Sequence, residues 1–193
     1  MKWLLIPMLG LAMIAPANLT QTSDPYKVEP ILTMLEEIDV ANQILPLVMD
    51  REQLNKMLLQ IEKCRGNVLA QEKKEADALK RAEAEIKKAH EEALKGIVPK
   101  DEFLTKMNKM FADFTNDRNG VKLANALLLR DAMKEILNPG QIKAAVGVVD
   151  KVYNEQTRQW EPGDTERKLI FFATQVLMNE DTYQFLVKYK RSL

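Results

Sequence analysis

Two short segments predict where amphipathic helices begin, and they constrain this chain more than any other feature. Each places a capping side chain three residues before a glutamine, Asp50 before Gln53 and Asn138 before Gln141. In such a capping box, the first side chain accepts a hydrogen bond from the third helical N–H, and the glutamine oxygen accepts one from the N–H of the capping residue. Pro139 strengthens the second start, because its fixed φ suits the first helical position. We expect a helix to begin at each box.

Hydrophobic periodicity predicts an all-α fold built from long helical hairpins. Apolar residues recur at steps of three and four through most of the chain, and no segment shows the strict alternation of a half-buried strand. Gly96 and Pro99 predict a turn between two long helices, and Gly66 is the expected place of a bend in the first of them. The sequence leaves open whether residues 100–137 form one helix or break at 116–120.

A shorter helix is expected before the first box, between Pro30 and Pro46. It carries a group of apolar residues: Ile31, Leu32, Met34, Leu35 and Ile38. Residues 157–164 contain a tryptophan, a proline and a glycine, and we expect them to form a linker before a last helical unit.

The N-terminus has the three parts of a secretory signal peptide. A lysine follows the first methionine, an apolar stretch spans residues 3–14, and Ala15-Pro16-Ala17 is a small-x-small cleavage site. We expect cleavage after Ala17 and a periplasmic location, with secretion as the alternative destination and an uncleaved anchor as the alternative role of this segment. The expected organisation is a signal peptide (1–17), a leader with a short helix (18–46), a helical domain (47–156) and a C-terminal helical extension (165–193).

The composition argues against several classes of function. The 28 basic residues balance the 28 acidic ones, which gives no electrostatic case for nucleic-acid binding, and nothing after the signal peptide predicts a membrane span. Cys64 is the only cysteine, so we expect a buried small hydrophobe, with an intermolecular disulfide as the alternative. We expect no enzyme and no cofactor, because the only histidine, His90, lies in a charged helical segment beside Glu91 and Glu92.

A metal site at His90 is the alternative to a solvated surface histidine. Glutamates at positions 85, 91 and 92 do not share its helix face. The residues one turn away are not metal ligands: Ile86, Lys87, Ala93 and Leu94. One helix therefore offers no chelate, and a site would need His90 from two copies of the chain.

The two boxes, the signal peptide and the order of helices resemble the LTXXQ-motif family of bacterial periplasmic proteins, which includes Spy and CpxP. The resemblance covers about residues 47–153. The second box, with Leu137, keeps the leucine and glutamine of Leu-Thr-x-x-Gln and has asparagine for threonine, whereas the first box keeps only the glutamine. The resemblance implies a curved all-α domain that pairs into an antiparallel homodimer and binds unfolded proteins without ATP, or assists envelope-stress signalling. Residues 165–193 have no counterpart in it.

The helix after Pro99 carries the candidate client-binding surface. Methionine and phenylalanine side chains line one face of it: Phe103, Met107, Met110, Phe111 and Phe114. Methionine repacks readily and is frequent on promiscuous binding surfaces, although core filling is the alternative role. The helix before the turn, Gln71–Lys95, has only a narrow, alanine-rich seam, for which we expect an antiparallel partner helix and hence a homodimer.

These observations favour an exported, non-enzymatic protein that binds unfolded or partner proteins, as an ATP-independent chaperone or an envelope-stress accessory factor. A periplasmic metal-binding or metal-sensing helical protein is one alternative. A structural helical adaptor is the other.

Overall fold

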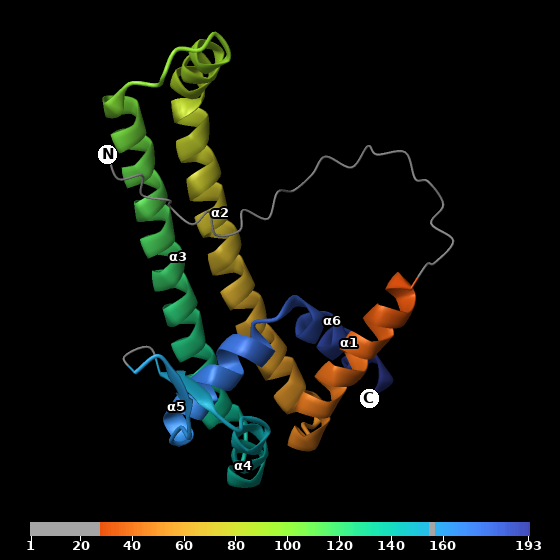
Figure 1. The fold of residues 1–193 in the computed structure, drawn as a ribbon. Helices are drawn as coiled ribbons and strands as arrows, with labels where there is room; N and C mark the ends of the chain where they lie inside the picture. The colour runs from red at the N-terminus through yellow and green to blue at the C-terminus, as the bar shows by residue number, and fades with distance from the viewer. Residues whose placement is uncertain (1–27, 155–156) are drawn as a thin grey trace.

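A computed structural model describes residues 28–154 and 157–193 (Figure 1). The expected all-α class is confirmed, with one small addition, a two-stranded antiparallel sheet. The expected signal peptide and most of the leader lie outside the described residues. In chain order the elements are α1 (Glu29–Ile44), the 3₁₀ turn η1 (Leu45–Leu47), α2 (Arg51–Leu94), α3 (Asp101–Ile136), α4 (Pro139–Val148), β1 (Val152–Asn154), β2 (Gln159–Glu161), α5 (Thr165–Phe172), the π-helical segment η2 (Ala173–Leu177) and α6 (Glu180–Ser192).

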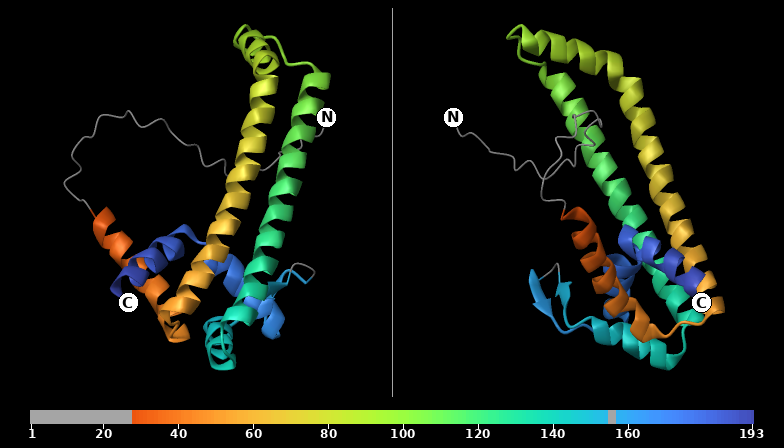
Figure 2. Two further views of the ribbon diagram at one scale, coloured as in Figure 1. Left: turned by 180° about the vertical axis from the view of Figure 1, so that it is seen from behind. Right: turned by 90° about the vertical axis from the view of Figure 1, so that its right-hand side faces the viewer.

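The long antiparallel hairpin of α2 and α3 dominates the molecule (Figure 1). The chain reverses at Gly96, whose φ of 80° lies in the region that glycine adopts without strain. Helix α3 continues through residues 116–120, so the segment that the sequence left open is one helix. The bend expected at Gly66 is wrong: α2 runs straight through its golden part and bends in its distal, yellow-green part (Figure 2).

The apolar core lies at the base of the hairpin, where the shorter elements gather around it (Figures 1 and 2). It contains buried side chains from all six α-helices, including Ile44 of α1, Leu54 of α2, Met133 of α3 and Phe172 of α5. Helices α5 and α6, which were expected as an extension, contribute to this same core. One continuous core of this kind predicts cooperative unfolding of the base.

The segment expected as a linker, residues 157–164, contains a strand. Strands β1 and β2 pair antiparallel, with Tyr153 opposite Trp160. The two rings lie 5.6 Å apart, and Trp160 also contacts Phe171 edge-on at 5.9 Å. Three residues per strand are too few to show period-two alternation, which is why the sequence pattern did not reveal the sheet.

Candidate functional site

The two capping boxes form as predicted. The Asp50 side chain accepts from the Gln53 N–H at 2.8 Å, and the Asn138 side chain accepts from the Gln141 N–H at 3.0 Å. Each glutamine oxygen in turn accepts from the N–H of its own cap. Pro139 is the first residue of α4, and Leu137 is buried immediately before the cap. The helix starts at Arg51 and Pro139 are therefore confirmed.

The structure also joins the two boxes, which the sequence did not predict. The Gln53 amide donates to the Gln141 oxygen at 2.9 Å, and the Gln141 amide donates back to the Gln53 oxygen at 2.8 Å. The same two amides donate to the carbonyls of Ile136 and Val48. Val48 has a φ of 46°, which is unusual for a β-branched residue. This reciprocal pair, the glutamine joint, ties the turn before α2 to the turn between α3 and α4.

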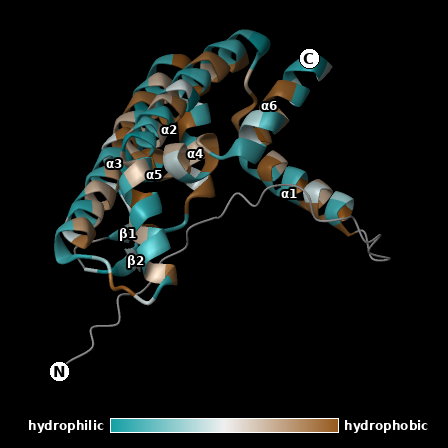
Figure 3. Cartoon of the chain, turned by 90° about the horizontal axis from the view of Figure 1, so that it is seen from above, coloured by the Kyte–Doolittle hydropathy of each residue, from teal (hydrophilic) through white to brown (hydrophobic). Residues whose placement is uncertain are grey.

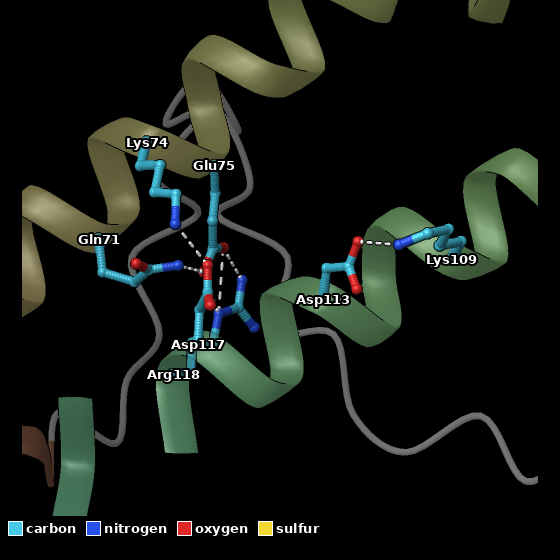
Figure 4. A network of polar contacts seen from close by, with 7 residues as sticks. All are labelled: Gln71, Lys74, Glu75, Lys109, Asp113, Asp117 and Arg118. Atoms are coloured by element: carbon cyan, nitrogen blue, oxygen red, sulfur yellow. Dashed lines mark hydrogen bonds and ion pairs between the residues drawn. The ribbon is translucent and has the colours of Figure 1, made fainter. Parts of the chain in front are cut away.

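Above the core, the hairpin is held by a cluster of charged side chains (Figure 4). Arg118 of α3 donates to both oxygens of Glu75 on α2, at 2.8 and 3.0 Å from its Nε. The Gln71 amide donates to Glu75 at 3.1 Å, and Lys74 pairs with Asp117 at 2.6 Å. Lys106 and Glu85 form a further interhelical pair closer to the tip. The upper hairpin therefore joins its helices by ionic contacts, which we call the polar clamp.

The polar clamp shifts the pKa values of its carboxyl groups. Hydrogen bonds from Arg118 hold the pKa of Glu75 below its ordinary range, and the Gln71 amide acts in the same direction. Lys74 lowers the pKa of Asp117. The Glu75 side chain is only 7% exposed, but its partner Arg118 is 64% exposed. Water screens that partner, so the pair contributes modestly to stability.

A pH titration checks the clamp. Because the pKa of Glu75 is lowered in the folded protein, its stabilising contribution is complete above the unfolded pKa and is lost as the pH falls through the folded one. We expect Glu75→Gln to cost about 0.5–1 kcal/mol of unfolding free energy near pH 7 and progressively less as the pH falls below the unfolded pKa. The measurement is urea unfolding at several pH values. Glu83→Gln, which removes an exposed pair with Lys87, is the control, and equal losses for both variants would contradict the interpretation.

The expected client-binding face does not form one surface. Met107 and Phe114 are each only 8% exposed, whereas Phe111 is 50% exposed and Phe103 and Met110 are intermediate. Phe114 lies with Lys74 and Ala78 of α2 around one depression. Met107 and Phe111 therefore do not share an environment, and for Met107 and Phe114 the core alternative is correct. The reason is that α3 turns this face partly towards α2.

The difference in burial between Met107 and Phe111 predicts how substitutions at these two positions affect stability. Met107→Ala removes a buried side chain, and we expect a loss of about 2 kcal/mol in unfolding free energy. Phe111→Ala removes a half-exposed ring whose neighbour is Phe114, with ring centroids 6.0 Å apart, and should cost at most about 1 kcal/mol. Urea unfolding followed by circular dichroism measures both. A larger loss for Phe111 than for Met107 would show that the burial pattern is misassigned.

The narrow seam of α2 does have an antiparallel partner helix, but that partner is α3 of the same chain. Ala82, in the middle of the seam, is buried, and the pairs of the polar clamp fix its register against α3. Because α3 already packs against the seam, the seam does not require a helix from a second copy of the chain. The homodimer itself stays a prediction.

Cys64 and His90 differ in their surroundings. Cys64 is buried, and desolvation raises its pKa to about 11, so the thiol is protonated at neutral pH and is a poor nucleophile. Its carbonyl accepts from the Asn125 amide at 3.0 Å, and Asn125 is fully buried between the two long helices. His90 is exposed on α2. Within residues 28–154 and 157–193, no three His, Cys, Asp or Glu side chains are grouped closely enough to hold a metal ion.

An exposed apolar surface lies on α1 and its N-cap residue, Val28, and α1 stands apart from the long hairpin (Figures 1 and 3). Its residues are 51–61% exposed and recur at helical spacing: Val28, Ile31, Leu32, Met34, Leu35 and Ile38. We call this set the α1 stripe. Val40 and Ile44 pack into the core from the opposite side of the helix. The periodicity of α1 was visible in the sequence, but nothing there showed which apolar residues would find a partner.

Two adjoining depressions line the inner side of the hairpin. They measure about 250 and 290 Å³ and share Val68, Glu72 and Met178. Met178 follows the π-helical segment η2, which contacts α3 and connects α5 to α6, and α6 in turn contacts α2. The depressions are open and partly apolar.

None of the helices in the described part of the chain is long and apolar enough to cross a membrane. Comparisons of the chain with protein-family models, with curated proteins and with solved structures found no match.

Proposed function

We propose that this chain is an exported, non-enzymatic protein-binding protein that captures unfolded or partly folded proteins without ATP. The observation that carries the proposal is the α1 stripe. Contiguous apolar side chains that face solvent mark interaction sites in folded proteins, whereas single exposed apolar residues are ordinary. Six such residues, from the N-cap Val28 to Ile38 of α1, follow one another at helical spacing, and each is more than half exposed.

Two further observations support binding over catalysis. Cys64, the only thiol, is buried and has a raised pKa. His90, the only imidazole, lies exposed on the upper part of α2. Acyl or phosphoryl transfer by a nucleophilic side chain requires a nucleophile and a base within hydrogen-bond reach of each other.

The proposal includes membership of the LTXXQ type and a periplasmic location. Two capping boxes at the expected positions support the membership, and the glutamine joint gives the glutamine of each motif a shared structural role. Export rests on the signal-like residues 1–17. In the periplasm a binding protein has no ATP supply, which fits capture by surface complementarity alone.

An aggregation assay tests the proposed function. The protein is isolated after export, and its N-terminus is determined by mass spectrometry, with Asn18 expected. A denatured client is diluted into buffer without ATP, and light scattering is followed. We expect scattering to fall as the protein is added and to reach its minimum at a molar ratio of about one chain of this protein per client chain.

Two matched double variants locate the activity. Ile31→Ser with Leu35→Ser removes the centre of the α1 stripe, and Leu94→Ser with Leu123→Ser removes two comparably exposed leucines elsewhere. We expect the first variant to lose suppression and the second to keep it, with the helix content of both checked by circular dichroism. A wild-type protein that leaves aggregation unchanged, yet binds one folded partner tightly, would be a structural adaptor and would refute the proposal.

A further inference from the structure

The α1 stripe is bordered by acidic side chains. Helix α1 contains acidic residues and no basic one, and its acids are Glu29, Glu36, Glu37 and Asp39. Glu37 pairs with Lys188 of α6, so this charge is already neutralised within the chain. On a helical projection the other three acids lie together along one edge of the stripe. The free half of α1 is therefore both apolar and negatively charged.

This charge is local and not a property of the whole molecule. The full chain has a formal net charge of +0, so a charged partner meets no general attraction. The polar clamp pairs acids with bases one by one along the hairpin. On the free half of α1 the acids instead lie beside exposed apolar residues, which is the pattern that orients an amphipathic partner.

The charge also discriminates among possible occupants of the stripe. Two α1 helices packed stripe to stripe would bring like charges together, which is unfavourable. An anionic lipid surface would repel the same acids. A segment with apolar residues on one face and lysine or arginine beside them satisfies both features of the stripe.

We infer that the α1 stripe binds a basic amphipathic segment of another protein, laid along the helix as a short helix of its own. The stripe extends over about three helical turns, or about 15 Å, and so contacts about 10 residues of a helical partner. Apolar side chains at i, i+3, i+4 and i+7 of the partner pack on Ile31, Leu35 and Ile38, and its basic residues pair with Glu29 and Glu36. This inference rests on the proposed function, since it names the class of segment that the protein captures.

Peptide binding tests the inference directly. The probe is a fluorescent leucine–lysine peptide of about 15 residues with helical amphipathic spacing, and its control is the same peptide with glutamate for every lysine. Fluorescence anisotropy with the processed protein should show binding of the lysine peptide at least about tenfold tighter than that of the glutamate peptide. Binding of both peptides with equal affinity would overturn the inference.

Variants show whether the peptide occupies the stripe. Ile31→Ser with Leu35→Ser should weaken lysine-peptide binding at least about tenfold, whereas Leu94→Ser with Leu123→Ser should leave it unchanged. Glu29→Gln with Glu36→Gln should weaken binding about three- to tenfold and make it less sensitive to salt. Full binding by the Ile31/Leu35 variant, with its helix content intact, would overturn the inference.

Sedimentation separates this partner from a second copy of the chain. A second copy could offer the basic depression of about 650 Å³ that Arg51, Lys190 and Arg191 help to line. A wild-type dimer that dissociates in the Ile31/Leu35 variant would assign the stripe to that interface and overturn the inference.

If the lysine peptide binds the stripe but clients still aggregate, the proposed function fails and the stripe serves a dedicated partner. If clients are protected but the peptide does not bind, the function stands and the inference fails.

Discussion

Replacing Phe172 with alanine is expected to lower the unfolding free energy by about 3–5 kcal/mol, the largest single effect we anticipate. Phe172 is 0% exposed and belongs to the same core as Leu54 of α2 and Met133 of α3. Its loss should therefore destabilise the base as a whole, and not only the C-terminal helices. Urea unfolding, followed by helix content, measures the change.

The neighbouring ring provides the control for this substitution. Phe171 is only partly buried, and it contacts Trp160 at the edge of the core. Phe171→Ala should cost about 1 kcal/mol, because less apolar surface returns to water. If Phe172→Ala costs no more than Phe171→Ala, or if it produces a separate early transition, residues 165–193 do not share the core of the hairpin.

Removing one glutamine of the glutamine joint is expected to cost about 2–3 kcal/mol, because it removes several part-buried hydrogen bonds at once. In Gln141→Ala, the Asn138 N–H and the Gln53 amide lose the Gln141 oxygen that accepts their hydrogen bonds. The Val48 carbonyl loses the Gln141 amide that donates to it. Gln53→Ala removes the matching set on α2. The double variant should lose about 1–2 kcal/mol less than the sum of the single variants, since both remove the same mutual contact.

A double-mutant cycle in urea measures that coupling. Gln184→Ala serves as the control, because this glutamine is exposed and donates only to Glu180, on the same helix. It should change stability by less than about 0.5 kcal/mol. Strictly additive losses at Gln53 and Gln141 would show that each glutamine acts only as the cap of its own helix.

The sequence was most informative where structure is set by neighbours along the chain. A capping box is a local arrangement of four residues, so Asp50 and Asn138 predicted helix starts correctly. The helical spacing of apolar residues likewise predicted helical structure on both sides of the turn at Gly96, but it left open whether residues 100–137 form one helix or two. The fold class follows from these local signals.

Contacts between distant segments were the part that sequence reasoning missed. The glutamine joint links residues far apart in the chain. The sequence of a capping box predicts the hydrogen bonds at its own helix start, but it does not predict a hydrogen bond to a second capping box. Met107 and Phe111 lie one turn apart, but small rotations of α3 decide which of them reaches α2. Asn125 interrupts an apolar run, a signal of a buried polar contact that only the pairing of α2 with α3 explains.

The division of the hairpin into an apolar base and an ion-paired upper half has a consequence for its motion. Ionic contacts weaken as salt screens them, whereas apolar packing does not. Raising the ionic strength therefore weakens the pairs of the polar clamp, and we expect the two helices to separate first near the tip, where few apolar side chains besides Ala82, Met107 and Phe114 are buried. We expect the glutamine joint and the buried Asn125 to keep the base folded while the upper parts of α2 and α3 move apart.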